Sequence, residues 1–356
     1  MKVVTAIDSF KGSMTSMEAG FAAAEGIHRV YADAEVQVRP LADGGEGTVE
    51  ALVAGMNGKT EHVKVTGPLG EPVICEYGII ESTKTAVIEM AGAAGITQVP
   101  DEKRNPLYTT TYGVGEVIKD AIEKGCRRFI VGIGGSATND GGVGMLQALG
   151  YAFLDKDGKQ VLPGARGLKD IAEITDAYVI PELAECKFRV ACDVTNPLCG
   201  ELGCSAIYGP QKGATPEMIK DMDQWLGAYA ELAKERFPKA DPVYPGTGAA
   251  GGMGFAFLTF TDAVLESGIN IVLDETKLED YIKDADLVIT GEGRMDGQTA
   301  MGKAPVGVAK LAKKYGKKVI AFAGAVQRDA RACNDAGIDA FFPILRGVVT
   351  LEEAMK

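Results

Sequence analysis

Short apolar runs rich in β-branched residues alternate with helix-forming stretches near both ends of the chain, and this alternation is the strongest constraint on the fold. At the N-terminus, Thr15 and Glu18 have the spacing of a capping box, which predicts that a helix begins there. A strand–loop–helix–strand order is typical of a parallel sheet covered by helices. The expected strands here are residues 3–7 and 35–41, and the expected helices are residues 17–30 and 48–54.

The C-terminal part repeats this order, with expected strands at 286–290, 318–323 and 341–344 and expected helices at 305–315 and 330–336. The middle of the chain contains the expected strands 61–66, 73–80, 85–89, 128–132 and 188–192 and the expected helices 112–124 and 216–236. A chain of 356 residues is long enough for two domains. We therefore predict an α/β fold in which residues 1–60 and 285–356 form one parallel-sheet domain, interrupted by a second α/β domain at 61–284.

The composition excludes several classes of function. Lys and Arg total 37 and Asp and Glu total 49, and the net charge of −12 argues against nucleic acid or an anionic membrane as a partner. No apolar run reaches the roughly 18 residues of a membrane helix. Seven Cys without a Cys-x-x-Cys spacing indicate reduced thiols, and hence a cytoplasmic protein. With only two His, a zinc site or a Ser-His-Asp triad is not expected, so acid–base chemistry should depend on Asp, Glu or Lys.

Carboxylates follow four of the expected strands, each beside Gly, Ser or Thr. A single Asp after a strand is commonly a turn or helix-cap residue. In open α/β sheets, however, ligands bind outside the carboxyl ends of the strands, and Mg²⁺ prefers carboxylate oxygens together with substrate phosphate. The sequence therefore predicts a magnesium site among these residues, which are Asp8, Asp43, Asp193 and Glu292.

A loop with five glycines lies at residues 132–142, between an expected strand and an expected helix. Glycine lets the backbone approach a phosphate closely, and the amides of the loop supply positive potential. The same segment fits Gly-x-Gly-x-x-Ala, with Asp155 further along the chain, which is a weak dinucleotide fingerprint. Both a phosphate-binding loop and a dinucleotide-binding turn remain open from the residues alone.

Two further glycine-rich segments carry less information. Residues 297–304 resemble a P-loop, but Ala304 lacks the hydroxyl group that would hold Mg²⁺. Lys303 in this segment is either an anion ligand or an ordinary surface lysine. Residues 248–254 are expected to allow close packing of a helix, with a backbone lining of the cleft as the alternative.

Six loop motifs stand out together, at residues 8–13, 42–48, 132–142, 193–200, 209–214 and 291–299. As a set they resemble the motifs of the bacterial type I glycerate kinases, and the similarity covers residues 1 to about 325. The resemblance implies ATP-dependent phosphorylation of D-glycerate, most often at the 2-hydroxyl group, and a flavodoxin-like domain interrupted by a second α/β domain.

For such a kinase, positioning and charge neutralisation matter more than covalent chemistry. The cofactors expected are ATP and Mg²⁺, with D-glycerate as the small-molecule substrate. The base that accepts the hydroxyl proton is Asp8 or Asp296, and the loop at 132–142 holds either ATP or glycerate. The candidate roles are catalytic for Asp8, Lys11 and Asp296; substrate-binding for Ser9, Arg294 and Lys212; nucleotide-binding for Gly134, Gly135, Ser136 and Asn139; and metal-binding for Asp43, Asp193 and Glu292.

Two alternative functions remain. The first is an NAD-type oxidoreductase of a small hydroxy acid, built on Gly132, Gly134 and Ala137 with Asp155. The second is a non-catalytic sensor of sugar acids. A sensor has no need of metal-binding carboxylates, which favours the kinase.

Overall fold

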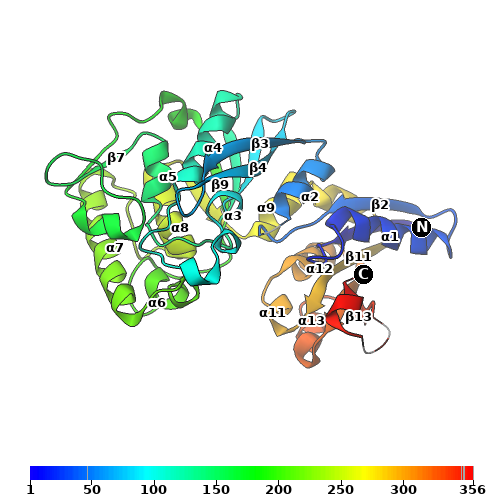
Figure 1. Ribbon diagram of the computed structural model, residues 1–356. Helices are drawn as coiled ribbons and strands as arrows, with labels where there is room; N and C mark the ends of the chain where they lie inside the picture. The colour runs from blue at the N-terminus through cyan, green and yellow to red at the C-terminus, as the bar shows by residue number, and fades with distance from the viewer. Residues whose placement is uncertain (46, 346, 348, 356) are drawn as a thin grey trace. The chain divides into compact units, whose positions relative to one another are not determined.

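The computed structural model describes residues 1–45, 47–345, 347 and 349–355. The chain folds into two compact units, one formed by Met1–Gly58 with Gly268–Lys356 and the other by Lys59–Ser267 (Figure 1). Glu46, part of the motif at 42–48, lies outside the described residues. No helix of the described residues is long and apolar enough to cross a membrane.

The first unit is built on a five-stranded sheet in the order β13-β12-β11-β1-β2, and every neighbouring pair of strands is parallel. With β11 as the third strand, this is the 2-1-3-4-5 order of a flavodoxin-like fold. The strands are β1 (Lys2–Ile7), β2 (Glu35–Pro40), β11 (Leu287–Met295), β12 (Lys318–Val326) and β13 (Ala340–Pro343). The helices are α1 (Ser16–His28), α2 (Thr48–Gly55), α9 (Gly268–Glu275), α10 (Leu278–Lys283), α11 (Gly297–Ala300), α12 (Ala304–Lys314), α13 (Ala332–Asp335) and α14 (Leu351–Ala354).

The predicted capping box of α1 is confirmed. Thr15 Oγ1 accepts a hydrogen bond from the amide of Glu18 at 3.2 Å, and the Glu18 carboxylate accepts one from the amide of Thr15 at 2.8 Å. These bonds satisfy amides that a helix start leaves without partners. Helix α1 therefore begins at a fixed point shortly after β1 and packs on β1 and β2.

The strand expected at 286–290 is longer in the structure, and this corrects the expectation that Glu292 follows the strand. Strand β11 continues to Met295, because Glu292 pairs with Ala323 and Arg294 with Ala325 of β12. The glycines at 291 and 293 suggested a loop, but pairing with β12 overrides the low strand preference of glycine. Glu292 and Arg294 are therefore held within a parallel sheet.

The second unit is built on a mixed six-stranded sheet in the order β10-β9-β6-β5-β4-β3. The neighbouring strands from β10 to β5 pair in parallel, whereas β4 pairs antiparallel with both β5 and β3. Its strands are β3 (Lys59–Thr66), β4 (Pro72–Ile80), β5 (Thr85–Glu89), β6 (Arg128–Gly132), β9 (Lys187–Ala191) and β10 (Ala263–Glu266), with a small separate hairpin of β7 (Ala152–Leu154) and β8 (Glu173–Thr175). Its helices are α3 (Ala91–Ala94), α4 (Tyr112–Glu123), α5 (Val143–Ala148), α6 (Cys204–Tyr208), α7 (Pro216–Arg236) and α8 (Ala249–Phe260).

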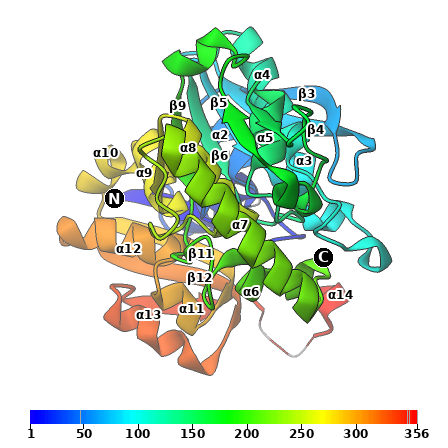
Figure 2. The same cartoon turned by 90° about the vertical axis from the view of Figure 1, so that its left-hand side faces the viewer.

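Aromatic side chains join the sheet and helices of the second unit. Phe129 of β6 stacks on Phe188 of β9 with ring centroids 4.7 Å apart. Helices α7 and α8 lie side by side (Figure 2), and Tyr229 meets Phe255 edge to face at 5.4 Å. These buried rings form a large continuous core, which fixes the loops at the ends of the strands.

The limits of the units differ from the expected domain limits at the second boundary. Residues 268–284 were expected in the inserted domain, but they belong to the first unit, where α9 and α10 pack against α12. The first limit, between Gly58 and Lys59, lies close to the expected one. The mixed α/β architecture and the parallel sheet built from both chain ends are as predicted.

Candidate active site

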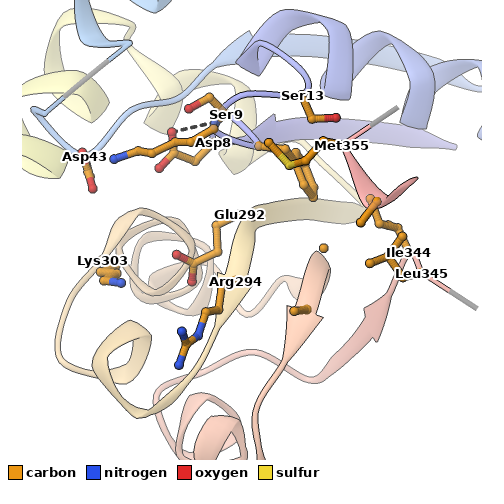
Figure 3. A pocket seen from close by; sticks show the side chains of 16 residues that line it. Asp8, Ser9, Ser13, Asp43, Glu292, Arg294, Lys303, Ile344, Leu345 and Met355 are labelled. Atoms are coloured by element: carbon orange, nitrogen blue, oxygen red, sulfur yellow. Dashed lines mark hydrogen bonds between the residues drawn. The ribbon is translucent and has the colours of Figure 1, made fainter. Parts of the chain in front are cut away.

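A pocket of about 390 Å³ lies in the first unit where β1 and β11 are neighbours (Figure 3). The strand order changes direction between these two strands, and such a switch point is where open α/β sheets bind their ligands. The pocket combines acidic and basic side chains from segments far apart in the sequence. Its polar and charged lining residues are Asp8, Ser9, Lys11, Ser13, Asp43, Glu292, Arg294 and Lys303.

Asp8 follows directly after β1 and is 7 % exposed. Its Oδ1 atom accepts a hydrogen bond from the amide of Ser9 at 2.7 Å, which fixes the carboxyl group at the carboxyl end of β1. Burial, and then the nearby charge of Asp43, raise the pKa of Asp8 to about 7, against the weaker opposing effect of Lys11. A carboxyl group with a pKa near neutrality is suited to accept a proton during a reaction.

Glu292 enters the same pocket from β11. Its Oε1 atom accepts a hydrogen bond of 2.6 Å from the hydroxyl group of Thr299. Burial raises the pKa of Glu292, while Thr299 and Lys303 lower it and the charges of Asp296 and Asp43 add to the rise. Asp43 itself accepts a hydrogen bond from the amide of Gly45 at 3.0 Å. Three carboxyl groups therefore share one small, partly buried volume.

Three cationic side chains line this pocket as well. Lys11 follows β1, Arg294 extends from β11, and Lys303 stands immediately before α12. Arg294 remains largely exposed, with its Nε atom 3.3 Å from Oδ2 of Asp296. A pocket with these cations can bind a small carboxylate beside the acidic groups.

Asp296 stabilises the start of a helix in this unit. It is the N-cap of α11, where its Oδ1 atom accepts hydrogen bonds from the amides of Gln298 and Thr299 at 3.0 and 3.3 Å. It does not belong to the lining of the pocket that contains Asp8. Of the two candidate bases, the structure therefore places Asp8 in the pocket and Asp296 at a helix start.

In the second unit, the glycine-rich loop connects β6 with α5. Gly134 and Gly135 are exposed, and Gly135 has a φ of +72°, which favours glycine. Residues 136–140 are all buried. Asp140 fixes the end of the loop, because its carboxylate accepts hydrogen bonds from the hydroxyl group of Thr111 at 2.8 Å and from the amides of Thr111 and Gly142 at 2.9 and 3.2 Å.

The glycines at 248–254 pack closely, as predicted, and they pack on this loop. The amide of Gly141 donates to the carbonyl oxygen of Gly251 at 2.9 Å. A Cβ atom at Gly251 would lie 2.1 Å from the carbonyl oxygen of Thr138. A side chain at this position would displace the loop.

The family model described as glycerate kinase family matches residues 3–356 of the chain. The chain belongs to the glycerate kinase family. Among related proteins, a glycerate kinase from Haemophilus influenzae is 52% identical over all of this chain and 94% of its own length, and a glycerate 2-kinase from Escherichia coli is 49% identical over all of this chain and 93% of its own length. A crystal structure of a Salmonella typhimurium LT2 protein assigned as glycerate kinase 2 superposes with a TM-score of 0.93 at 48% identity, covering all of this chain and 93% of that one.

The glycerate kinase family gives no support to the alternative of an NAD-type oxidoreductase. The structure adds a physical reason, since helix α5 begins at Val143, well after the end of β6 at Gly132. A dinucleotide fingerprint needs its glycines in a tight turn that leads directly into a helix. Asp155 instead closes a local turn, in which it accepts hydrogen bonds from the amides of Asp157 and Lys159.

Three candidates of the second unit have contrasting surroundings. Asn139 is fully buried, and its amide group donates to Ser205 Oγ at 2.8 Å. Lys212 is also buried, and its ammonium group donates to Ser136 Oγ at 2.9 Å and to the carbonyl oxygen of Thr138 at 2.6 Å. Asp193 lies after β9 and is exposed. The substrate, nucleotide and metal roles of these residues remain predictions.

The carboxyl groups of the first unit fit a divalent cation by their chemistry. Asp43 and Glu292 offer hard oxygen ligands, and the pKa values of Asp8 and Glu292 are raised by burial first and by neighbouring carboxylates second. Within the part of the chain that the structure describes, no three His, Cys, Asp or Glu side chains form a complete metal cluster. An ion held here would therefore take further ligands from phosphate and water, as Mg²⁺ commonly does.

Lys303, Thr299 and Ser16 were not singled out as site residues from the sequence. Lys303 is the anion-ligand alternative considered for the 297–304 segment, and the structure places it in the pocket. Thr299 could have been recognised from the sequence, because it lies three residues after Asp296, at the spacing of a helix-capping pair. For Ser16, nothing in the sequence indicates that its hydroxyl group contacts β1 and β2.

Proposed function

We propose that this protein transfers the γ-phosphate group of ATP to D-glycerate, with Mg²⁺ as cofactor and the 2-hydroxyl group as acceptor. The observation that carries the proposal is the buried Asp8 carboxyl group, with its pKa raised to about 7, in a small pocket that also contains three cations. Glycerate is a small carboxylate with hydroxyl groups, and such a pocket offers a counter-charge and a proton acceptor together. The relatives named glycerate kinase and glycerate 2-kinase support the same activity.

Asp8 is the proposed general base. In its ionised form it accepts the proton of the attacking hydroxyl group, and a pKa near neutrality makes this form available without making it a weak base. The amide of Ser9 orients the Asp8 carboxylate, and the Ser9 side chain in the pocket wall contributes to substrate binding.

Arg294, Lys11 and Lys303 are the proposed partners of the substrate's negative charges. Arg294 suits the glycerate carboxylate, because a guanidinium group can bind a carboxylate through two hydrogen bonds. Lys11 follows Asp8 closely in the chain, and its positive charge lowers the pKa of Asp8. Its charge therefore acts on the proposed site of proton transfer. We assign Lys11 to the stabilisation of charge that develops during transfer.

Asp43 and Glu292 of the first unit are the proposed ligands of Mg²⁺, and a metal role for Asp193 of the second unit remains a prediction. When bound, Mg²⁺ neutralises phosphate charge and orients the phosphate chain for transfer. Thr299 holds Glu292 through its hydroxyl hydrogen bond, so that the carboxylate keeps one orientation in the pocket. The exposed amides of Gly134 and Gly135, with Ser136, are the proposed contacts of the ATP phosphates.

The activity is tested by ³¹P NMR of the product formed from ATP, Mg²⁺ and D-glycerate. A phosphate on the 2-hydroxyl group couples to one proton and gives a doublet, whereas one on the 3-hydroxyl group couples to two and gives a triplet. We expect the doublet, and no product when Mg²⁺ is omitted. A triplet would correct the acceptor position alone, and an absence of ATP turnover would overturn the proposed activity.

A further inference from the structure

Lys212 is one of the largest fully buried side chains of the protein, with 2 % exposure. It is the last residue of a short 3-10 helix, Pro210–Lys212, and its side chain extends to the loop that follows β6. There its ammonium group donates to Ser136 Oγ and to the carbonyl oxygen of Thr138. The cation therefore stands behind the exposed turn at Gly134 and Gly135.

A buried ammonium group is costly unless its charge is compensated. Both hydrogen-bond acceptors of Lys212 are neutral oxygens, and the acidic groups that raise its pKa against the effect of burial are Cys204 and, more weakly, Asp140. Burial lowers the pKa of Lys212 to about 8, so that the ammonium group is still mostly protonated at neutral pH. A buried and incompletely compensated cation next to an exposed loop suggests that an anion completes the arrangement.

Several hydrogen-bond donors of the loop have no partner among the described residues. The carbonyl oxygen of Gly135 accepts a hydrogen bond from the amide of Ile96 at 2.8 Å. Because a trans peptide directs its C=O and N–H groups to opposite sides, the amide of Ser136 points away from Ile96. Within the described residues, the amides of Gly134, Gly135 and Ser136 have no hydrogen-bond acceptor in the protein.

The hydroxyl group of Ser136 becomes a donor for the same reason. Lys212 has only N–H groups, so Ser136 Oγ must accept in the hydrogen bond between them. The hydroxyl hydrogen of Ser136 is then available for another acceptor. Three backbone amides and one hydroxyl group in sequence thus form a set of donors, with a positive charge behind them.

We propose that Lys212 is a positioning residue that holds Ser136 and the Gly134–Ser136 amides as donors for a phosphate group of the bound nucleotide. Lys212 itself does not contact the substrate, since its side chain is enclosed by the protein. The inference rests on the proposed function, because it takes the phosphate from ATP. From the sequence, Lys212 was expected to bind the substrate directly. In the present proposal, Lys212 affects the affinity for the nucleotide indirectly.

The test compares the wild-type protein with Lys212→Met, Ser136→Ala and Ser136→Thr. Lys220→Met is the matched control, because Lys220 is an exposed lysine of the same unit. Isothermal titration calorimetry measures the binding of AMP-PNP and, separately, of D-glycerate. Steady-state kinetics gives KM for each substrate, and circular dichroism with thermal unfolding checks that every variant folds.

We expect Lys212→Met to weaken AMP-PNP binding and raise KM for ATP about 10- to 100-fold, and Ser136→Ala to do so about 3- to 10-fold, because hydrogen bonds to charged groups are lost. Ser136→Thr retains the hydroxyl group and should restore nucleotide affinity. D-glycerate binding should be unchanged in all variants, and Lys220→Met should match the wild type throughout.

Unchanged AMP-PNP affinity in a folded Lys212→Met protein would overturn the inference, and so would a loss confined to D-glycerate, which would identify the anion as the glycerate carboxylate. If Lys212→Met does not fold, the AMP-PNP affinities of Ser136→Ala and Ser136→Thr are compared instead. Equal affinity in these two variants would then overturn the inference. A wild-type protein that neither binds AMP-PNP nor turns over ATP would overturn the proposed function instead. The wild-type result therefore separates the two failures.

Discussion

The hydroxyl group of Ser16 donates a hydrogen bond of 2.6 Å to the carbonyl oxygen of Ile7, the last residue of β1. The same hydroxyl oxygen accepts a hydrogen bond of 2.8 Å from the amide of Leu41, just after β2. Ser16 is buried at the start of α1. One side chain therefore ties together the two strand ends from which Asp8 and Asp43 emerge.

Ser16→Ala should reduce both stability and activity. The substitution leaves the carbonyl oxygen of Ile7 and the amide of Leu41 without this partner in a buried position, which costs about 1–3 kcal/mol of unfolding free energy. It also loosens the positions of Asp8 and Asp43, so kcat should fall about 10-fold. Urea unfolding and steady-state kinetics measure the two effects.

Ser82→Ala serves as the control for this change, because Ser82 is exposed. Its unfolding free energy should remain within about 0.5 kcal/mol of the wild type, with unchanged kcat. A Ser16→Ala protein with wild-type kcat despite lower stability would show that the strand ends keep their positions without the hydroxyl group.

Asp8→Asn and Asp296→Asn form a matched pair that tests which carboxylate is the base. Asp8→Asn removes the proton acceptor, and kcat should fall about 100-fold or more. Asp296→Asn should change kcat by less than about threefold, since an asparagine side chain caps a helix about as well as aspartate does. Initial-rate kinetics with both variants is the measurement, and similar losses in the two would contradict the assignment of Asp8 alone.

The sequence predicted the sheet of the first unit because its strands are short apolar runs between helix-forming segments. It could not predict the end of β11, since Gly291 and Gly293 favour a loop locally and only pairing with β12 keeps the chain extended. The missed helices α9 and α10 follow β10 of the second unit but belong to the first unit, together with the strand β11 that comes after them. They pack against α12, which lies further along the chain, and this contact is not visible in their own sequence.

For the candidate site, the sequence identified the carboxylates after β1 and β2 but not their supports. Asp8 and Asp43 stand out because a carboxylate that follows an apolar strand can be recognised from the sequence alone. The partnership of Lys212 with Ser136 is not visible there, because the two residues are far apart in sequence and meet only in the folded unit. Burial is equally hidden in the sequence, as the enclosed side chains of Lys212 and Asn139 illustrate.

Lys303→Met should weaken glycerate binding. Lys303 lines the pocket with Asp8 and Glu292, and its charge lowers the pKa of Glu292. Removing this cation while keeping a side chain of similar length should raise KM for D-glycerate about 10-fold, because a charged contact is lost. Lys310→Met is the control, since Lys310 is exposed on α12 and lies outside the pocket lining. A raised KM for ATP with an unchanged KM for glycerate would assign Lys303 to the nucleotide instead.

The raised pKa of Asp8 predicts how stability and activity depend on pH. Between about pH 4 and pH 7, the folded protein keeps a proton on Asp8 that the unfolded chain has released, so this group destabilises the fold as pH rises through that window. Asp8→Asn removes the effect, and its unfolding free energy relative to the wild type should increase from pH 4 to pH 8 by up to about 4 kcal/mol. Urea unfolding in EDTA at several pH values measures this change. A relative stability of Asp8→Asn that instead rises as pH falls would show that Asp8 is stabilised in its ionised form and is not the group proposed here.

The same pKa predicts how activity depends on pH. In the wild type, kcat/KM should fall below about pH 7 as the base is protonated, and a pH–rate profile measures this fall.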